Sequence, residues 1–405
     1  MKNWKIGRLE QAYKEMWRKL ASTSTSDEFY NLSIFQSSNL SISMINRRKF
    51  IAQTSAAAAA LTLSHAAFPN LITQRKDKLG VALVGLGYYS TDLLAPALQL
   101  TQKCSLAGIV TGTPAKAEKW KQQYKIPEKN IYNYDTFDSI ANNPDIDVIY
   151  VVLPPSMHAE YSIRAANAGK HVWCEKPMAM TVAECQSMID ACKKNKVSLS
   201  IGYRVHHEPN TQRIIQIRKD LVYGKVVSAM AAAGYRDDRT THWKQKKSLG
   251  GGAMYDMGVY PLNAVRYATG LEPIAVSAKA STTRPEIYTE VEETMHFDLD
   301  FPGGVTAKCE TTFGRGINIL ETKFTNGWYK LEPFQAYSGI KGVTSDGKVL
   351  NATVPHQQAK QMDDDAGSIL DRKPMLVPGE EGLKDIRVVE AIYRSVKEKQ
   401  KVKIS

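Results

Sequence analysis

Glu175 and Lys176 form a charged pair that directly follows an apolar stretch at residues 171–174 and precedes Pro177. Charged side chains are costly to bury unless something uses their charge. In an α/β unit, the groups that meet a ligand lie beyond the carboxyl ends of the strands. The position of the pair therefore predicts that Glu175 and Lys176 take part in chemistry on a bound ligand.

A glycine-rich turn lies upstream, between an apolar stretch at residues 81–84 and a helical pattern. Gly85 allows a tight bend, and Gly87 lets the backbone approach a pyrophosphate resting on the N-terminus of the following helix. Ser90 stands in place of the third glycine of this motif, and its small side chain still permits packing of the helix on the strand. The order of strand, turn and helix predicts dinucleotide binding, and together with Lys176 it predicts a redox site.

The end of the second expected strand bears on the choice of cofactor. NAD sites usually place Asp or Glu there to hold the ribose hydroxyls, whereas residues 109–116 contain no acid. The hydroxyls of Thr111 and Thr113, on either side of Gly112, and the charge of Lys116 suit a 2′-phosphate. We therefore expect NADP rather than NAD, although Lys116 is equally consistent with a solvated lysine in the first turn of the next helix.

Asp256 and Tyr260 are four residues apart in a helical stretch that follows three glycines at 250–252. Both side chains should project from one helix face, with Asn263 on the same side. Tyrosine is a poor base at its usual pKa of about 10, but a nearby ammonium favours the phenolate, and Lys176 is the available cation. The spacing predicts an acid-base group; the alternative is that Tyr260 is a core aromatic of an amphipathic helix.

Alternating strands and helices must position the residues of the first half. Apolar stretches at 81–84, 106–110, 148–153, 171–174 and 197–201 alternate with helical ones, which predicts a doubly wound parallel sheet. Later strands at 274–280, 294–301, 305–313, 319–324 and 328–331 are separated by short turns, and a helix at 382–397 packs back on the body. The expected fold class is α/β: an N-terminal Rossmann domain (79–201) and a C-terminal α+β domain (202–405) with an open, largely antiparallel sheet.

Leu153, Pro154 and His158 follow the expected strand at 148–153. The prolines of this loop stiffen it above the cofactor. His158 begins the next helix, where a structural hydrogen bond and a cofactor contact are equally consistent.

His206 and His207 follow Arg204 in a stretch that we expect to be extended. Neighbouring strand residues point to opposite faces, so the two histidines cannot clamp one metal ion. Trp243 fits either stacking on a ligand or core packing. The five cysteines are scattered without a CxxC pairing, and we expect no metal site.

Much of the positive charge lies at the front of the chain. Residues 1–78 hold 12 Lys and Arg against 5 Asp and Glu, and so carry +7 of the net +12. The remainder shows no basic stripe with interleaved aromatics, so we expect no nucleic-acid partner.

Residues 44–66 have the layout of a twin-arginine export signal: Arg47 and Arg48, an Ala-rich apolar run and a small-residue cleavage site. The run is too short to span a bilayer, which takes about 20 apolar residues. We expect export to the periplasm by the twin-arginine (Tat) machinery, without stable membrane insertion; the alternative is an Ala-rich surface helix. Because such a signal stands at the start of a chain, we expect Met44 to be the true start and residues 1–43 to be over-annotated. An N-terminal arm is expected to follow the signal, up to residue 78.

From residue 79 onward the chain resembles the glucose-fructose oxidoreductase / inositol dehydrogenase family (Gfo/Idh/MocA). The similarity runs through motifs at 85–89, 153–154, 158–160, 168–178, 201–204, 250–252, 256–263 and 378–382. Inositol-dehydrogenase-like members generally carry histidine where this chain has Tyr260. That tyrosine, the export signal and the proline-glycine-glutamate run at 378–380 are most similar to the glucose-fructose and aldose-aldose oxidoreductase branch.

The resemblance implies a tightly held NADP and hydride transfer between the nicotinamide and the C1 hydroxyl of an aldose, or a sugar carbonyl in reverse. Tyr260 would take the hydroxyl proton, Lys176 would orient and polarise the same oxygen, and Asp256 would fix the sugar or the tyrosine. It also implies a homodimer or homotetramer built on the open sheet face. The expected cofactor contacts are Gly85, Leu86, Gly87, Tyr88, Tyr89, Thr111, Gly112, Lys116, Leu153, Pro154, His158, Glu175, Lys176 and Arg204.

Two other functions stay open at this point. One is a nicotinamide-dependent glycoside hydrolase of the same superfamily, although such enzymes tend to lack the intact motif at 175–177. The other is a noncatalytic binding protein that is stabilised by its cofactor.

Overall fold

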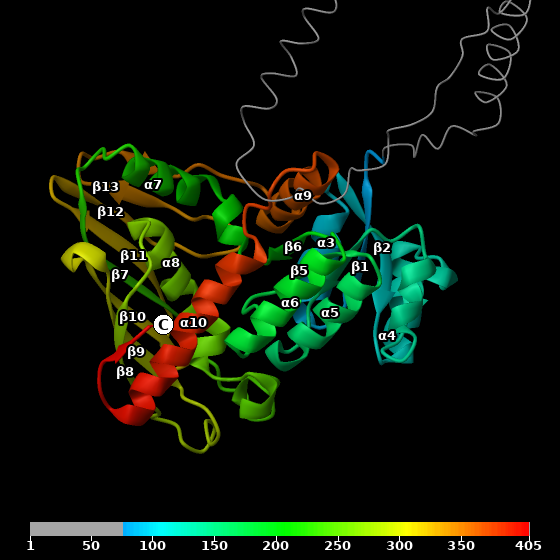
Figure 1. Ribbon diagram of the computed structural model, residues 1–405, viewed down its shortest axis with the longest axis horizontal. Helices are drawn as coiled ribbons and strands as arrows, with labels where there is room; N and C mark the ends of the chain where they lie inside the picture. Colours follow the sequence, from blue (N-terminus) through cyan, green and yellow to red (C-terminus); the bar gives the residue numbers. More distant parts are fainter. Residues whose placement is uncertain (1–75, 405) are drawn as a thin grey trace, which may run out of the picture. The chain divides into compact units, whose positions relative to one another are not determined.

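The computed structural model describes residues 76–404 (Figure 1). The expected export signal at 44–66 and the expected start at Met44 lie outside the described residues and stay predictions. Among the described residues, no helix has both the length and the apolar character needed to cross a membrane.

A six-stranded parallel sheet is built from the first half of the described chain, in the order β3-β2-β1-β4-β5-β6. The chain moves outward from β1 to β3 and then places β4 on the other side of β1, so the expected doubly wound arrangement is confirmed. Every residue of β1 is buried, which explains its continuous apolar run. The strands are β1 (Leu79–Val84), β2 (Cys104–Val110), the unexpected β3 (Ile131–Tyr132), β4 (Val148–Val151), β5 (His171–Cys174) and β6 (Leu199–Ile201).

Helices connect these strands. The first begins as a π-helical turn at Tyr89–Leu94 and continues as α3 (Ala95–Leu98). The last begins with a capping box, in which the Thr181 side chain accepts from the backbone N–H of Glu184 and the Glu184 side chain reaches back. This last helix is α6 (Val182–Lys194), and the two helices between are α4 (Pro114–Tyr124) and α5 (His158–Asn167).

A helix from the last part of the chain, α9 (Gln357–Leu370), packs on this first sheet. Ala359, Met362 and Ala366 share one hydrophobic core with residues of β1 and α3, and Figure 1 shows α9 beside α3. The Asp363 carboxylate accepts a hydrogen bond at 2.7 Å from the backbone N–H of Lys103. The second half of the chain thus supplies one layer of the first half.

The second sheet has nine strands in the order β14-β13-β12-β11-β7-β10-β9-β8-β15. Its pairs are antiparallel except for β7 with β10. Along β9, buried residues alternate with less buried ones, as expected for a sheet with one face on the core and one open. The strands are β7 (Val226–Gly234), β8 (Ala275–Ser281), β9 (Thr294–Asp300), β10 (Thr306–Thr312), β11 (Ile317–Phe324), β12 (Gly327–Leu331), β13 (Gly342–Thr344), β14 (Val349–Leu350) and β15 (Val402–Lys403).

Three helices accompany the second sheet: α7 (Pro209–Lys219), α8 (Val259–Thr269) and α10 (Gly379–Glu398). Helix α10 starts at the proline-glycine-glutamate run, with Pro378 as its N-cap residue. A Cβ on Gly382 would lie 2.8 Å from the Cβ of Met178, so the glycine lets α10 approach the loop after β5 closely. The helix therefore ties the second sheet to the loop that carries Lys176.

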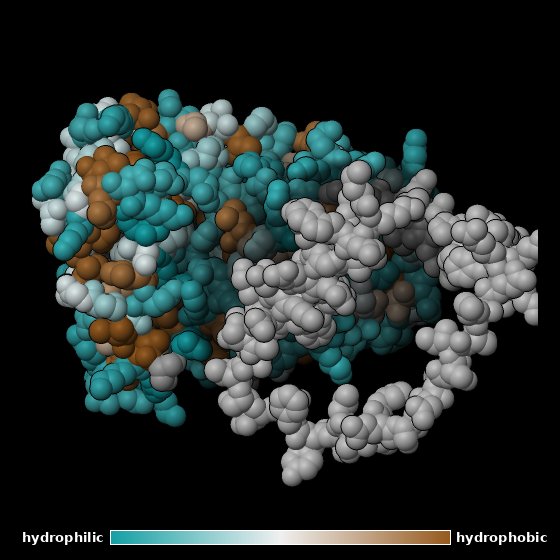
Figure 2. Space-filling model, turned by 45° about the horizontal axis from the view of Figure 1, so that its top comes forward, coloured by the Kyte–Doolittle hydropathy of each residue, from teal (hydrophilic) through white to brown (hydrophobic). Residues whose placement is uncertain are grey.

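The space-filling view in Figure 2 shows hydrophobic side chains over the part formed by the second sheet and its helices. The exposed large apolar side chains of this part include Val222, Val227, Ile274, Trp328, Val343 and Val349.

Candidate active site

The glycine-rich turn between β1 and the π-helical turn has the two properties that dinucleotide binding requires. Gly85 has a φ of 89°, and a Cβ there would lie 2.4 Å from the carbonyl oxygen of Val152, so only glycine fits. A Cβ on Gly87, in contrast, would have no atom within 4 Å. The buried Ser90 hydroxyl donates to the carbonyl oxygen of Gly85 at 2.6 Å, and this hydrogen bond stabilises the turn. The open space above Gly87 fits a pyrophosphate.

The end of β2 reaches the same turn. The Lys116 ammonium donates to the carbonyl oxygen of Leu86 at 3.1 Å, so this exposed lysine extends to the glycine-rich turn. Thr111 is buried, and its hydroxyl oxygen accepts a hydrogen bond at 3.2 Å from the backbone N–H of Thr113. A Cβ on Gly112 would lie 3.1 Å from the ring of Tyr134. The structure therefore brings the residues expected to choose the cofactor together with the turn.

Tyr88 and Tyr89, which follow the turn, face different surroundings. Tyr88 is 66 % exposed. The Tyr89 ring lies 6.1 Å from the ring of Tyr337, between centroids. Burial raises the pKa of Tyr89 well above its usual value.

Glu175 turns into the protein at the end of β5. Its Oε1 accepts a hydrogen bond from the Tyr150 hydroxyl at 2.6 Å, and its Oε2 accepts from the backbone N–H of Lys176 at 3.3 Å. A Cβ on Gly202 would lie 2.7 Å from Oε1, so the absence of a side chain there makes room for the carboxyl group. Burial raises the pKa of Glu175. These bonds fix the end of β5, from which Lys176 extends.

Lys176 points toward the second half of the chain. Its Nζ donates to the carbonyl oxygen of Asp256 at 2.7 Å and lies 3.9 Å from the Oδ1 atom of the same residue. The same nitrogen lies 4.6 Å from the centroid of the Tyr260 ring. Burial alone would lower the pKa of Lys176, but its acidic neighbours, first among them Tyr260, outweigh burial and raise it. The amine is therefore a cation held between the two other expected catalytic residues.

Asp256 lies in a π-helical turn at Met254–Gly258, directly before α8. Its Oδ2 accepts from the Lys244 ammonium at 2.7 Å and from the Tyr235 hydroxyl at 3.1 Å. Burial would raise the pKa of Asp256, but Lys244 and Lys176 outweigh burial and hold it below the usual value. The carboxylate thus stays ionised between two lysines.

The start of this segment is anchored from the neighbouring loop. The backbone N–H of Met254 donates to the Glu292 carboxylate at 2.8 Å, and the Tyr393 hydroxyl donates to the same oxygen at 3.0 Å. A Cβ on Gly252 would lie 2.6 Å from Oε1 of Glu292, which explains the glycine. These contacts hold Asp256 and α8 in place.

Tyr260 is in the first turn of α8 and is 7 % exposed. Its hydroxyl oxygen accepts a hydrogen bond from Nη1 of Arg204 at 3.0 Å. Lys176 approaches the ring and Arg204 approaches the oxygen, so one tyrosine has two cations beside it. The structure thus brings together Lys176, Asp256 and Tyr260, as the spacing predicts.

Asn263 does not join this group. Its side-chain amide contacts His206 and donates to Asp385 at 2.9 Å, so it belongs to a buried polar cluster behind α8. Seven residues of regular α-helix would return Asn263 to the face of Asp256, but Asp256 lies in the π-helical turn before α8, where that spacing does not hold. The expected shared face is therefore limited to Asp256 and Tyr260.

His158 and the two later histidines make contacts within the protein. The ring nitrogens of His158 lie 2.8 Å from the carbonyl oxygens of Leu153 and Pro177, and the ring joins the loop at Pro154 to the loop after β5. Burial lowers the pKa of His158.

The extended conformation expected after Arg204 is wrong: residues 204–207 form a 3-10 helix. The strand-alternation argument for His206 and His207 therefore does not apply. His206 contacts Asn263, whereas His207 contacts Asp364, so hydrogen bonds to different helices separate them.

Four contacts of the site were not indicated by the sequence. Lys244 and Tyr235 hold Asp256, and Tyr337 and Gln335 lie against Arg204. All come from loops at the ends of β7 and β12, where no periodic pattern marks a side chain as inward. Trp243 lies next to Lys244, whose ammonium is 5.7 Å from the Trp243 ring.

Three family models match the chain. The oxidoreductase family model with an NAD-binding Rossmann fold covers residues 79–203. The GFO/IDH/MocA C-terminal domain covers residues 211–324, and the oxidoreductase C-terminal alpha/beta domain covers residues 348–404. The chain belongs to the Gfo/Idh/MocA oxidoreductase family.

Three known proteins illustrate what this chain is similar to. The aldose-aldose oxidoreductase of Caulobacter crescentus, solved with glycerol, is 40 % identical with a TM-score of 0.77, covering 80 % of this chain and 99 % of its own. The D-xylose 1-dehydrogenase (NADP(+)) of Haloarcula marismortui is 26 % identical over 345 residues, covering 82 % of this chain and 95 % of that protein. A levoglucosan dehydrogenase solved with NADH and levoglucosan is 20 % identical with a TM-score of 0.71, covering 81 % and 99 %, and shares the fold.

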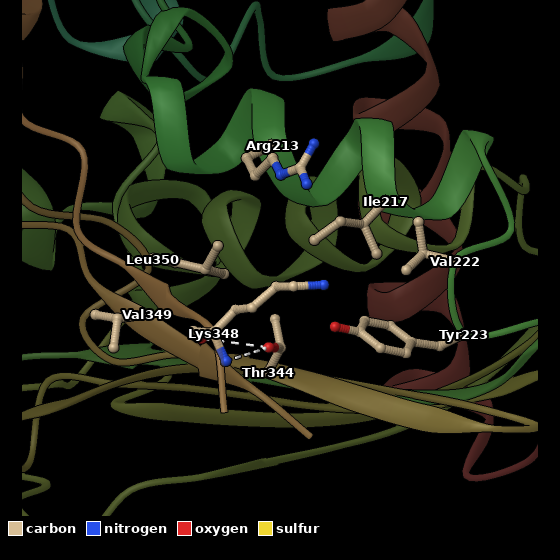
Figure 3. Close-up of a pocket in the computed structure, with 8 residues that line it drawn as sticks. All are labelled: Arg213, Ile217, Val222, Tyr223, Thr344, Lys348, Val349 and Leu350. Atoms are coloured by element: carbon tan, nitrogen blue, oxygen red, sulfur yellow. Dashed lines mark hydrogen bonds between the residues drawn. The ribbon is translucent and has the colours of Figure 1, made fainter. Parts of the chain in front are cut away.

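A hollow of about 350 Å³ lies elsewhere, between α7 and the β13–β14 hairpin (Figure 3). The basic groups at its rim are Arg213 and Lys348, and Lys348 is paired at 2.7 Å with Asp346. The Tyr223 hydroxyl donates to the same carboxylate. None of the residues that the sequence marks as functional lines this hollow.

Proposed function

We propose that the protein is an NADP-dependent sugar oxidoreductase that interconverts the C1 hydroxyl and carbonyl forms of an aldose. The observation that carries this proposal is the convergence of Lys176, Asp256 and Tyr260 beyond the carboxyl end of β5. The name of the 40 % identical structure, an aldose-aldose oxidoreductase, supports an aldose as the substrate.

The preference for NADP rests on the residues around the nucleotide turn. Lys116 is held at the carbonyl oxygen of Leu86, so its charge is available to a 2′-phosphate. Residues 109–116 contain no carboxylate that would repel this phosphate. The name of the Haloarcula relative, which specifies NADP(+), supports the same choice.

The bound nicotinamide would supply a hydride acceptor or donor. Tyr260 performs the proton transfer: during oxidation its oxygen takes the proton of the sugar hydroxyl, and during reduction it returns the proton. The ammonium of Lys176 polarises the reacting sugar oxygen and stabilises its negative charge. Asp256 keeps Lys176 in place and ionised, and Lys244 and Tyr235 hold Asp256 in turn.

The test is turnover of purified protein with a panel of aldoses and ketoses, followed by the absorbance of reduced nicotinamide. Tyr260→Phe should reduce kcat by about 10²- to 10⁴-fold, the usual contribution of a general acid or base. Lys176→Met should reduce kcat by about 10²- to 10³-fold, the usual contribution of a group that stabilises a developing negative charge. The matched control is Tyr267→Phe, because Tyr267 is a buried tyrosine of the same helix without a hydrogen bond to the site. Undiminished activity of both site variants would refute the assignment. Release of sugar from glycosides without net reduction would identify a hydrolase instead.

We also propose that the protein is exported to the periplasm through its twin-arginine sequence at 44–66, already folded around its cofactor. The supporting observation is the Arg47-Arg48 pair with the apolar run after it. Intact mass of the exported protein tests this: a mature chain that begins after residue 66 is expected, and one that retains Trp4 or Trp17 contradicts it.

We propose further that the protein forms a homodimer or homotetramer through the open face of the second sheet. Exposed apolar side chains on its strands, such as Val227 and Trp328, support this surface as the interface. Light scattering of the wild type and of Trp328→Lys tests it. A monomeric wild type would contradict it.

A further inference from the structure

Arg204 is a buried cation without an acidic partner. It is 1 % exposed, and no carboxylate of the described residues lies within 4.0 Å of its guanidinium, whose side-chain hydrogen bonds go to Tyr260 and Gln335. Its Nε has no hydrogen-bond partner among the described protein atoms. Burial would lower the pKa of Arg204, but its neighbours outweigh burial and raise it, first among them Tyr260 and after it Tyr89, Tyr337 and Glu175. The compensation of this buried charge therefore comes mainly from tyrosine hydroxyls.

The contacts that Arg204 does make point to one atom. Nη1 donates to the hydroxyl oxygen of Tyr260 at 3.0 Å, whereas Nη2 lies 3.4 Å from Oε1 of Gln335, a long contact. The guanidinium carbon is 5.5 Å from the centroid of the Tyr260 ring and 4.8 Å from that of Tyr337. The guanidinium thus lies beside the rings of Tyr260 and Tyr337 and donates to the hydroxyl oxygen of Tyr260.

The direction of this hydrogen bond has a chemical consequence. Because the Tyr260 oxygen accepts from Arg204, the tyrosine's own proton must point elsewhere and is available to a substrate oxygen. A guanidinium also binds a tyrosinate more strongly than a neutral phenol, since hydrogen bonds between charged groups are the stronger ones. Lys176 lies beside the ring rather than at the oxygen, so it does not duplicate this contact.

We propose that Arg204 is the positioning residue that stabilises the tyrosinate form of Tyr260 and directs its proton toward the sugar. This inference rests on the proposed function, in which Tyr260 carries the proton. When the sugar hydroxyl is oxidised, its proton passes to the tyrosinate oxygen while Arg204 stays protonated. When a carbonyl is reduced, the proton leaves the same oxygen, and Arg204 compensates the negative charge that forms.

Other charged and titratable groups surround Tyr260, and any pH dependence must be assigned against them. Those that face it from the packed elements are Lys176, Asp256, Tyr89, Tyr203 and Tyr337, and Glu175 acts on its two cations, Lys176 and Arg204.

The first experiment compares the wild type, Arg204→Lys and Arg204→Gln in aldose oxidation across pH. Arg204→Gln should lose about 10- to 100-fold in kcat near pH 7, the value of a hydrogen bond to a charged group. The difference in kcat between Arg204→Gln and the wild type should become smaller as the pH rises, because hydroxide then forms the tyrosinate without help from Arg204. Arg204→Lys, which keeps the charge, should lose less. A loss that is equal at every pH would indicate a structural role and overturn the proposal.

A second experiment does not depend on turnover. The ultraviolet signal of tyrosinate is titrated in the purified protein without substrate, and the signal of Tyr260 is isolated by subtracting the Tyr260→Phe variant in each background. With Arg204 the tyrosinate should appear at lower pH than with Arg204→Lys or Arg204→Gln. Identical titrations overturn the proposal even if the sugar activity is found. A shifted titration in a protein that oxidises no sugar would instead place the failure in the proposed function.

Discussion

Replacing Lys244 by methionine tests how the site keeps Asp256 ionised. Lys244 donates to Oδ2 of Asp256 at 2.7 Å, and the two side chains are 17 % and 9 % exposed. A hydrogen bond to a charged group is worth about 1.5–3 kcal/mol. Loss of one partner of a fully buried pair costs about 3–5 kcal/mol, but Lys176 and the Tyr235 hydroxyl remain beside the carboxylate. We therefore expect Lys244→Met to lower the free energy of unfolding by about 1.5–3 kcal/mol.

The pH dependence of this effect has a definite sign. Because the lysines hold the pKa of Asp256 below its usual value, the pair stabilises the fold above the unfolded pKa of about 3.9. That stabilisation is lost as the pH falls through the folded pKa. In Lys244→Met, burial is opposed by fewer charges, so Asp256 protonates more readily. The difference in the free energy of unfolding between the wild type and Lys244→Met should consequently be largest near neutral pH and become smaller in acid.

Urea unfolding of a double-mutant cycle with Asp256→Asn measures the coupling at constant cofactor concentration. The expected coupling is about 1.5–3 kcal/mol at pH 7. Lys384→Met is the control, since Lys384 is 44 % exposed and pairs with the exposed Glu272, where a loss of about 0–1 kcal/mol is expected. A coupling below about 0.5 kcal/mol between Lys244 and Asp256, within the error of additivity, would refute the reasoning.

Three further predictions follow from the same structure. Gly85→Ala should lower the temperature of thermal unfolding, because its Cβ would lie 2.4 Å from the Val152 carbonyl oxygen. Gly87→Ala should leave thermal unfolding unchanged and weaken nucleotide binding, because a Cβ there meets no protein atom within 4 Å. Equal unfolding temperatures of the two variants would contradict this. Lys116→Ala should raise the Kd for NADP more than that for NAD in titration calorimetry, and equal changes would remove Lys116 from the choice of cofactor. Burial raises the pKa of Asp365 to about 6, above its unfolded value, so stability present below about pH 4 should be lost as the pH rises through 6. In urea unfolding, the wild type should lose about 2–3 kcal/mol of its free energy of unfolding over this pH range, whereas Asp365→Asn should not. The same pH dependence in both proteins would show that Asp365 is not the group responsible.

The strands of the first sheet were predictable because their signal is local. β1, β2, β4 and β5 are continuous apolar runs with turn residues behind them, and the parallel sheet buries both of their faces. β3, with two residues, carries no period and was missed. β7 was missed as well: its run of small residues, VVSAMAAAG, has neither the bulky side chains nor the alternation that indicate a strand.

The residues of the candidate site also differ in whether a local sequence pattern indicates them. Lys176, Asp256 and Tyr260 were recognised because each follows a strand end or repeats at a helical spacing. Lys244 lies in a 3-10 helix of three residues and Tyr337 in a loop, and neither segment is long enough to show a period that marks which side chain turns inward. Their roles depend on contacts between residues far apart in the chain.

The sequence alone determined the doubly wound sheet, the nucleotide turn and the charged pair after β5, because strand period, glycine positions and strand-end charges are local properties of the chain. Only the tertiary structure decided that Arg204 meets the Tyr260 hydroxyl, that Lys244 shares Asp256 with Lys176, and that α9 returns to cover the first sheet. The physical reason is that burial and pairing of charge are set by which segments pack together, and the residues of one segment do not record the partner that another supplies.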